Sequence, residues 1–136
     1  MKTYFIDTNL FIRFLTNDDP QKADHVEALL DEAAAGKVKL VTAEMVLAEV
    51  VWVLESSYGL KNVEIGPMIK AIVATPGLEV INGTLVDKAV ELYVSRNIDF
   101  IDGYIAAVMR KRGISEIFSY DKKHLARIKE ITRKEP

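Results

Sequence analysis

Short apolar runs alternate with segments of helical periodicity along almost the whole chain. Residues 3–6, "TYFI", are β-branched, aromatic and apolar without alternation, which predicts a first strand buried on both faces. The runs at 37–42 and 78–81 predict a second and a third strand, and "EIFSY" at 116–120 predicts a fourth. We expect these strands to be parallel, because helical segments long enough for crossovers separate them.

The helical segments end at recognisable capping and turn-forming residues. "LFIRFL" at 10–15 predicts a short helix or turn, and Gly66 and Pro67 interrupt an otherwise helical pattern between 60 and 77. The terminal residues 122–131 predict a turn of helix or a last short strand. The remaining predicted helices, each with its expected N-cap, cover 20–35 (Asp19), 43–58 (Thr42), 85–96 (Thr84) and 100–112 (Asp99).

Length and composition favour one soluble domain. A chain of 136 residues that is 49% hydrophobic can form a single core, so we expect one domain over 1–136. No stretch approaches the roughly 18 uninterrupted apolar residues of a membrane span, and nothing resembles a signal peptide, so we expect a cytoplasmic protein. With no cysteine and two isolated histidines, any metal is expected to have oxygen ligands.

The net charge of −2 conceals an uneven distribution. Residues 109–136 carry nine Lys and Arg against four acids, whereas the rest of the chain carries nine against sixteen. The basic C-terminal stretch can approach phosphates or an acidic partner. The simpler explanation is a solvated helix end, where the helix dipole favours cations.

Four acids stand out because of where they fall in the predicted fold. Asp7 and Asp121 follow the first and fourth strands, and Glu49 and Asp102 lie in early turns of helices that leave the same sheet edge. Ligands bind at that edge in parallel sheets, so we expect four carboxylates to face one crevice. Such crowding requires a divalent cation, and oxygen ligands suit Mg²⁺ or Mn²⁺. Ions of this kind support phosphodiester hydrolysis.

Glu49 gives the clearest signal. It is the only polar residue of "MVLAEVVWVL" at 45–54 and lies one turn from Met45 and Trp52, so we expect it to be buried. A buried carboxylate must be paired, protonated or bound to a cation, and a salt bridge in the core with Arg13 or another base is the structural alternative. Glu44, in the first turn of the same helix, needs only the helix dipole as an explanation.

Each of the other three acids has an ordinary structural alternative. Asp7 can form an Asx turn or cap the short helix that follows it, and Asp121 can start a turn after the fourth strand. Asp102 lies three residues after Asp99, a spacing that resembles a capping box. The metal-site hypothesis therefore depends on all four acids meeting.

Four blocks of the chain together resemble the signature blocks of PIN-domain proteins, specifically VapC-type toxins of prokaryotic toxin–antitoxin pairs. These blocks are "FIDTNLFIRFL", "VTAEMVLAEVVWVLE", "DFIDGYIAAVMRKRG" and "IFSYDKKH". The resemblance implies a three-layer α/β/α fold with a mainly parallel sheet and a Mg²⁺- or Mn²⁺-dependent ribonuclease. It also implies a homodimer that a small antitoxin inhibits by inserting its C-terminal segment into the active-site groove.

The resemblance assigns roles to individual positions. Its conserved acids fall on Asp7, Glu49, Asp102 and Asp121, and its supporting polar residues fall on Thr8, Asn9 and Ser119. Gly103 occupies a position where the family often has alanine, and Asp99 receives no ligand role.

Two other enzyme classes share the fold class but not the motifs. A phosphotransferase of the haloacid dehalogenase type needs a second acid where this chain has Asn9. Response-regulator receivers need an acidic pair after the first strand, which is also absent. A ribonuclease that processes RNA without an antitoxin, and a non-catalytic RNA-binding PIN module, remain alternatives.

Overall fold

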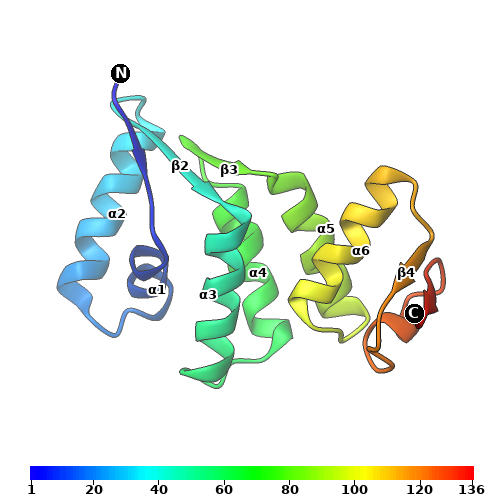
Figure 1. Cartoon of the computed structure of the whole chain (residues 1–136). Coiled ribbons are helices and arrows are strands. Elements are labelled where there is room, and N and C mark those ends of the chain that lie inside the picture. The colour runs from blue at the N-terminus through cyan, green and yellow to red at the C-terminus, as the bar shows by residue number, and fades with distance from the viewer. The chain divides into compact units, whose positions relative to one another are not determined.

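The computed structural model describes all 136 residues, which form two compact units, Met1–Gly83 and Thr84–Pro136. Unit 1 contains a parallel sheet in the order β1-β2-β3 (Figure 1). Its strands are β1 (Thr3–Phe5), β2 (Lys39–Ala43) and β3 (Leu78–Ile81). Helices α1 (Thr8–Thr16) and α2 (Pro20–Ala34) connect β1 to β2, and α3 (Glu44–Ser56) and α4 (Asn62–Val73) connect β2 to β3.

The core of unit 1 joins the central strand to the helices. Leu40 of β2 is fully buried, with Leu47 and Leu54 of α3 and Ile65 and Ile69 of α4. On α3 the buried positions are Leu47, Val50, Val51 and Leu54, which is the i, i+3, i+4, i+7 spacing of one helix face. That face determines which residues of α3 remain outside the core.

Two sequence-based predictions for the sheet were wrong. Tyr4 and Phe5 are 44% and 59% exposed, because β1 is an edge strand of this sheet, and only Ile6 at its end is buried. Thr42 does not cap α3, whose N-cap is Ala43 without a side-chain hydrogen bond. The buried Thr42 hydroxyl instead donates to the carbonyl oxygen of Ile6 at 3.0 Å. This bond ties the end of β1 to β2.

The segment 60–77, whose helical pattern is interrupted at Gly66 and Pro67, contains helix α4. It runs through Gly66 and Pro67 without a break, although proline removes one hydrogen bond of the helix interior. Its start is stabilised by Glu64, whose carboxylate accepts the Lys61 N–H at 3.2 Å. Burial of Ile65, Gly66 and Ile69 shows that packing against the core outweighs the local disruption.

Unit 2 contains two helices and a two-stranded parallel sheet. Its elements are α5 (Gly83–Ser95, of which Gly83 belongs to unit 1), α6 (Phe100–Arg112), β4 (Glu116–Phe118), the 3₁₀ turn η1 (Leu125–Arg127) and β5 (Thr132–Lys134). β4 pairs with β5, so every strand pair of the protein is parallel and the predicted α/β class is confirmed. The predicted cap Thr84 lies inside α5.

Helices α5 and α6 approach closely at a glycine. A Cβ atom at Gly103 would lie 2.8 Å from the carbonyl oxygen of Ala89, so no other residue fits there without movement. Nearby, the Tyr93 and Phe100 rings make an edge-to-face contact with centroids 6.1 Å apart. None of the helices in the protein combines the length and the apolar content that a bilayer crossing requires.

Candidate functional site

Asp7 is the first predicted site residue and lies where β1 gives way to α1. It is the N-cap of α1, with φ −91° and ψ 167°, and its carboxylate accepts the Thr8 N–H at 2.7 Å. The capping alternative is therefore correct for its local role. The carboxylate remains exposed at the N-terminus of the helix.

Thr8 has a feature that capping does not explain. Its side chain is buried, with 5% exposure, and its hydroxyl has no hydrogen-bond partner. A buried hydroxyl without a partner is costly, and such groups in native proteins often serve a function. This hydroxyl belongs to the residue directly after Asp7, at the start of the same helix. The Thr42 bond to Ile6 fixes the strand end that precedes both residues.

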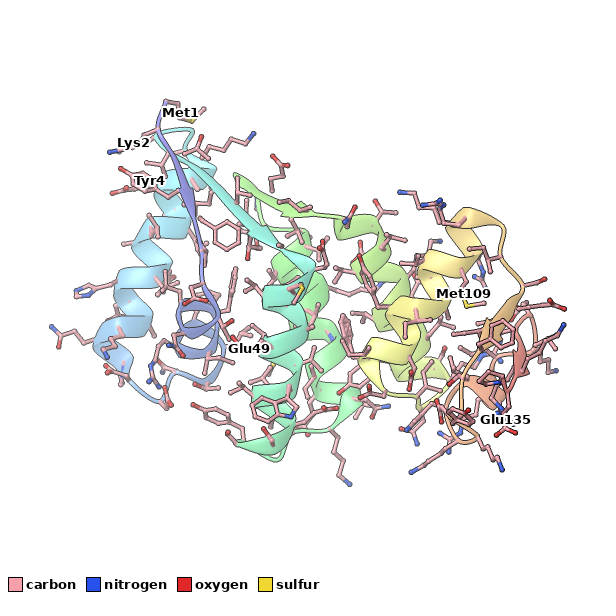
Figure 2. The ribbon with its side chains drawn as sticks, in the orientation of Figure 1. Met1, Lys2, Tyr4, Glu49, Met109 and Glu135 are labelled. Carbon is pink, nitrogen blue, oxygen red and sulfur yellow. The ribbon has the colours of Figure 1, made fainter.

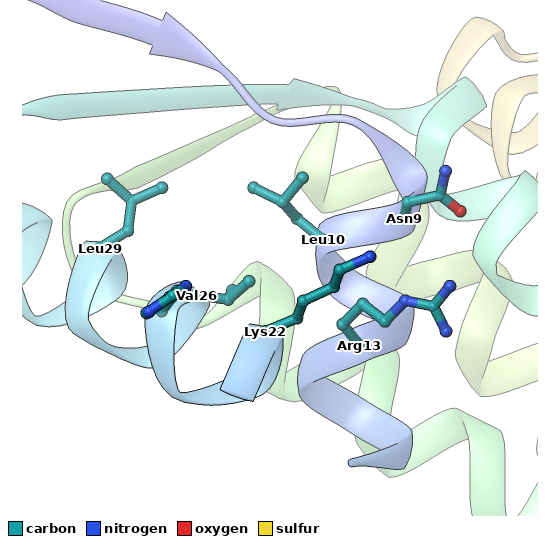
Figure 3. A pocket seen from close by; sticks show the side chains of 7 residues that line it. Asn9, Leu10, Arg13, Lys22, Val26 and Leu29 are labelled. Atoms are coloured by element: carbon teal, nitrogen blue, oxygen red, sulfur yellow. The ribbon is translucent and has the colours of Figure 1, made fainter. Parts of the chain in front are cut away.

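A groove of about 420 Å³ between α1 and α2 begins at Asn9, the second predicted supporting residue (Figure 3). Leu10, Val26 and Leu29 form its apolar side. Arg13 lines it as well but is paired with Asp18 through contacts of 2.9 and 3.1 Å. Asn9 therefore lies at the junction between this groove and the Asp7 turn.

Glu49 lies on the surface of α3, so its predicted burial was wrong (Figure 2). Met45 and Trp52, its neighbours one turn away, are 77% and 64% exposed. The helix is apolar on nearly all sides, so its sequence did not identify the buried face, and the core uses the Leu47 face instead. The salt-bridge alternative is also wrong, because Arg13 binds Asp18. Glu49 is an accessible carboxylate.

Glu44 and Asn82 add a polar contact at the same end of the unit 1 sheet. The Asn82 amide donates to the Glu44 carboxylate at 3.1 Å, which links the first turn of α3 to the end of β3. Asn82 has a positive φ of 58°, a conformation that asparagine tolerates well. Glu44 thus has a structural partner, which agrees with its interpretation as an ordinary helix-start acid.

In unit 2, Asp121 holds the turn that follows β4. Its carboxylate accepts backbone N–H groups of Lys123 at 2.9 Å, His124 at 3.2 Å and Leu125 at 3.3 Å. These hydrogen bonds, that of Lys123 foremost, lower the pKa of Asp121 below its ordinary value. Ser119 supports the turn by accepting the Asp121 N–H at 3.0 Å. Asp121 thus starts a turn and also presents a stable negative charge.

Asp102 has the opposite environment. It is half-buried in the first turn of α6, and burial raises the pKa of its carboxyl group, followed by the negative charges of Asp121 and Asp99. The Asp102 and Asp121 carboxylates are therefore close enough to influence each other. Two acids whose pKa values are driven apart are typical of a functional site.

The capping-box alternative for Asp102 was wrong. Asp99 is the N-cap of α6 but makes no side-chain cap hydrogen bond, and its own N–H donates to Nδ1 of His124 at 3.2 Å. That N–H is the group a capping-box acid would have to bind. Asp102 is therefore free of this structural task.

His124 is the residue that sequence reasoning missed. Its ring nitrogen Nδ1 accepts the Asp99 N–H, and its backbone N–H donates to the Asp121 carboxylate. It joins the Asp121 turn to the start of α6. The spacing of His124 three residues after Asp121 in "SYDKKH" was the available signal, but an isolated histidine carries little information by itself.

The four predicted site acids are divided between the two units. Asp7 and Glu49 belong to unit 1, and Asp102 and Asp121 belong to unit 2. Neither unit alone brings three carboxylate or imidazole groups into a complete metal site. Carboxylate oxygens are the donors that a hard divalent cation prefers, and such an ion would offset the negative charges that, after burial, raise the pKa of Asp102.

Comparisons with known proteins find two similar chains. The chain is 25% identical over 118 residues to a VapC ribonuclease of Aquifex aeolicus (strain VF5), covering 87% of each protein. The crystal structure of VapC20 from Mycobacterium tuberculosis, described as a sarcin-ricin loop cleaving toxin, matches 90% of this chain and 92% of its own at 24% identity, with a TM-score of 0.37.

The family comparison spans both units. The model of the PIN domain matches residues 4–131, which takes in Asp7, Glu49, Asp102 and Asp121. This match confirms the resemblance seen in the four sequence blocks. The chain therefore belongs to the PIN-domain family.

Proposed function

We propose that this protein is a divalent-metal-dependent endoribonuclease that acts as the toxin of a toxin–antitoxin pair. The observation that carries the proposal is the carboxylate pair of unit 2, where Asp102 is crowded by Asp121 and Asp99. Its support from relatives is the PIN-domain match over 4–131 and the similarity to a VapC ribonuclease. Phosphodiester hydrolysis is the chemistry that such carboxylates and a hard cation serve together.

We propose Asp7, Glu49, Asp102 and Asp121 as the acids that hold Mg²⁺ or Mn²⁺, with Thr8, Asn9 and Ser119 in support. The family match supports this set because it covers all four acids in one domain, and we propose that residues 1–136 act as one. When bound, the ion lowers the pKa of a water and stabilises the charge that develops on the phosphate.

The residues of this chain contribute in different ways. Asp121 stays ionised because three backbone N–H groups bind its carboxylate, so it offers a permanent negative ligand. Burial, and then the negative charges of Asp121 and Asp99, raise the pKa of Asp102, and a cation held by these carboxylates would offset the repulsion between them. The Thr8 hydroxyl, which is buried next to Asp7 and has no protein partner, would hydrogen-bond to a water enclosed with it.

The partners follow from the toxin assignment. We propose that a small VapB-like antitoxin inhibits the enzyme and that the active form is a homodimer in the cytoplasm, where RNA and antitoxin are made. The exposed Met45 and Trp52 on α3 are a chemically suitable surface for a second protein chain. The alternative function is that of a ribonuclease without an antitoxin. In that case the gene of this protein would have no neighbouring gene for a small antitoxin.

The test is cleavage of RNA by purified protein with Mg²⁺ or Mn²⁺ and with chelator. We expect metal-dependent cleavage and a loss of at least about 100-fold in kcat for Asp7→Asn, because one ligand charge is removed. Asparagine caps helices as well as aspartate does, so this variant keeps α1 intact. The exposed Asp24→Asn in α2 is the matched control and should retain full activity.

Equal cleavage in chelator would contradict the metal mechanism. Full activity of Asp7→Asn would remove Asp7 from the site. If the protein binds RNA tightly but never cleaves it, the non-catalytic RNA-binding module would replace the nuclease proposal.

A further inference from the structure

A second groove, of about 550 Å³, lies in unit 2 between α5 and α6. Figure 1 shows these two helices side by side. They touch at Gly103, and the groove begins one helical turn further along α6, at Ala107. Its floor is apolar and is formed by Leu85, Leu92 and Ala107. The nuclease chemistry proposed above does not use this groove.

The rim of the α5–α6 groove is strongly basic. Four cationic side chains line it, namely Lys88, Arg96, Arg110 and Lys111, against the single acid Glu91. The chain as a whole is negatively charged, with a net charge of −2, whereas the lining of the groove is positively charged. A basic rim above an apolar floor fits a ligand that carries phosphates on a partly apolar body.

The cations of the rim differ in how far they are already engaged. The Arg96 guanidinium donates to the Arg127 carbonyl at 3.2 Å, and Arg110 meets Glu130 only at 3.5 Å, with both side chains more than half exposed. Lys88 and Lys111 make no hydrogen bond or ion pair and lie exposed on facing helices. These two lysines are therefore available to an anionic ligand.

The position of α6 favours RNA over an acidic protein as that ligand. The same helix carries Asp102 in its first turn and Arg110 and Lys111 in its last turn. Eight residues of α helix separate Asp102 from Arg110 by about 12 Å. A strand whose reacting phosphate lies at the acidic end thus has neighbouring phosphates within reach of the basic end.

We propose that the α5–α6 groove binds the sugar–phosphate backbone of single-stranded RNA next to the cleaved bond, with Lys88 and Lys111 as its phosphate contacts. This inference rests on the proposed ribonuclease function and names the surface that holds the substrate. No aromatic side chain lines the groove, so it provides no stacking platform. Binding there is set by charge and tolerates any sequence.

The test uses the full-length protein, a labelled single-stranded oligoribonucleotide of mixed sequence, and chelator to prevent cleavage. The double substitution Lys88→Gln/Lys111→Gln should weaken binding on the order of tenfold near 0.1 M salt. It should also reduce the slope of log affinity against log salt by about 1.4, since each lost single-strand contact contributes about 0.7. In the cleavage assay, KM should rise while kcat stays the same.

The matched control is Lys37→Gln/Lys129→Gln, which removes two exposed lysines outside the groove. It should keep the wild-type salt slope, and both double variants should keep the wild-type melting temperature. Equal slopes for the groove variant and the control would overturn the inference, whereas a wild-type protein that neither binds nor cleaves RNA would overturn the proposed function itself. If the groove variant loses binding to a glutamate-rich peptide but still binds RNA like the wild type, the groove is a protein-docking site. That result would also overturn the inference.

Discussion

At the scale of single residues, the site depends on what surrounds each carboxylate. The Asp121 carboxylate accepts hydrogen bonds from three backbone N–H groups. The Asp102 carboxylate, in contrast, makes no capping-box hydrogen bond at the start of α6. The hydrogen bonds stabilise the charged form of Asp121 and lower its pKa. Burial and the nearby charges of Asp121 and Asp99 destabilise the charged form of Asp102 and raise its pKa. Two neighbouring aspartates therefore differ in how readily their carboxyl groups ionise.

These environments predict opposite effects on stability at different pH. The pKa of Asp102 is raised on folding, so its protonated form is favoured; the folded state gains stability as pH falls from the folded pKa towards the unfolded value. The pKa of Asp121 is lowered, so its contribution is complete above the unfolded value near 4 and is lost as pH falls through the folded value.

Urea unfolding in chelator between pH 3 and pH 8 measures both effects. At pH 7, Asp102→Asn should leave the free energy of unfolding unchanged or raised. Asp121→Asn should lower it by about 1 kcal/mol, because an amide cannot accept all three N–H groups. A clear loss of stability for Asp102→Asn would mean that its carboxylate has a stabilising partner.

At the scale of elements, the contact between α5 and α6 is set by one missing side chain. Alanine at 103 would raise helix propensity by about 1 kcal/mol, but its Cβ would lie 2.8 Å from the Ala89 carbonyl oxygen. We expect Gly103→Ala to destabilise the protein by about 1–3 kcal/mol, measured as a lower midpoint in urea. The matched control is Gly83→Ala, where a Cβ would meet Val73 and Val80 no closer than 3.4 Å, and its midpoint should not fall.

The same scale shows what the sequence could and could not predict. Asp19 and Gly113 marked helix ends correctly, because capping is a local interaction that the sequence contains. Thr42 failed as a cap because a tertiary hydrogen bond to Ile6 competes for its hydroxyl. Glu49 was placed in the site on an argument from burial that was wrong, since an all-round apolar helix does not reveal which face the core will take.

At the scale of the whole molecule, the PIN-domain match crosses the boundary between the two compact units. If the four acids serve one metal-dependent reaction, substitutions in either unit should have the same effect on metal binding. Mn²⁺ at about 100 times its dissociation constant should stabilise the wild type by about 2.7 kcal/mol. Asp7→Asn, Glu49→Gln and Asp102→Asn should each remove most of that gain.

Thermal melts with and without Mn²⁺ provide the measurement, and Glu49→Gln supplies a sharp check. Because Glu49 is exposed and has no ion-pair partner, its substitution should change metal-free stability by less than about 0.5 kcal/mol. Metal stabilisation that survives in the unit 1 variants but not in Asp102→Asn would restrict the ion to unit 2.

The approach of Gly103 to Ala89 also has a consequence for relatives that carry alanine at this position. Such a protein must find room for one methyl group between the two helices, so the turn that bears its acid must stand farther out or rotate. In such a relative the start of this helix, and the acid that it carries, would take a different position from the one seen here, although the two chains differ at that point by a single methyl group.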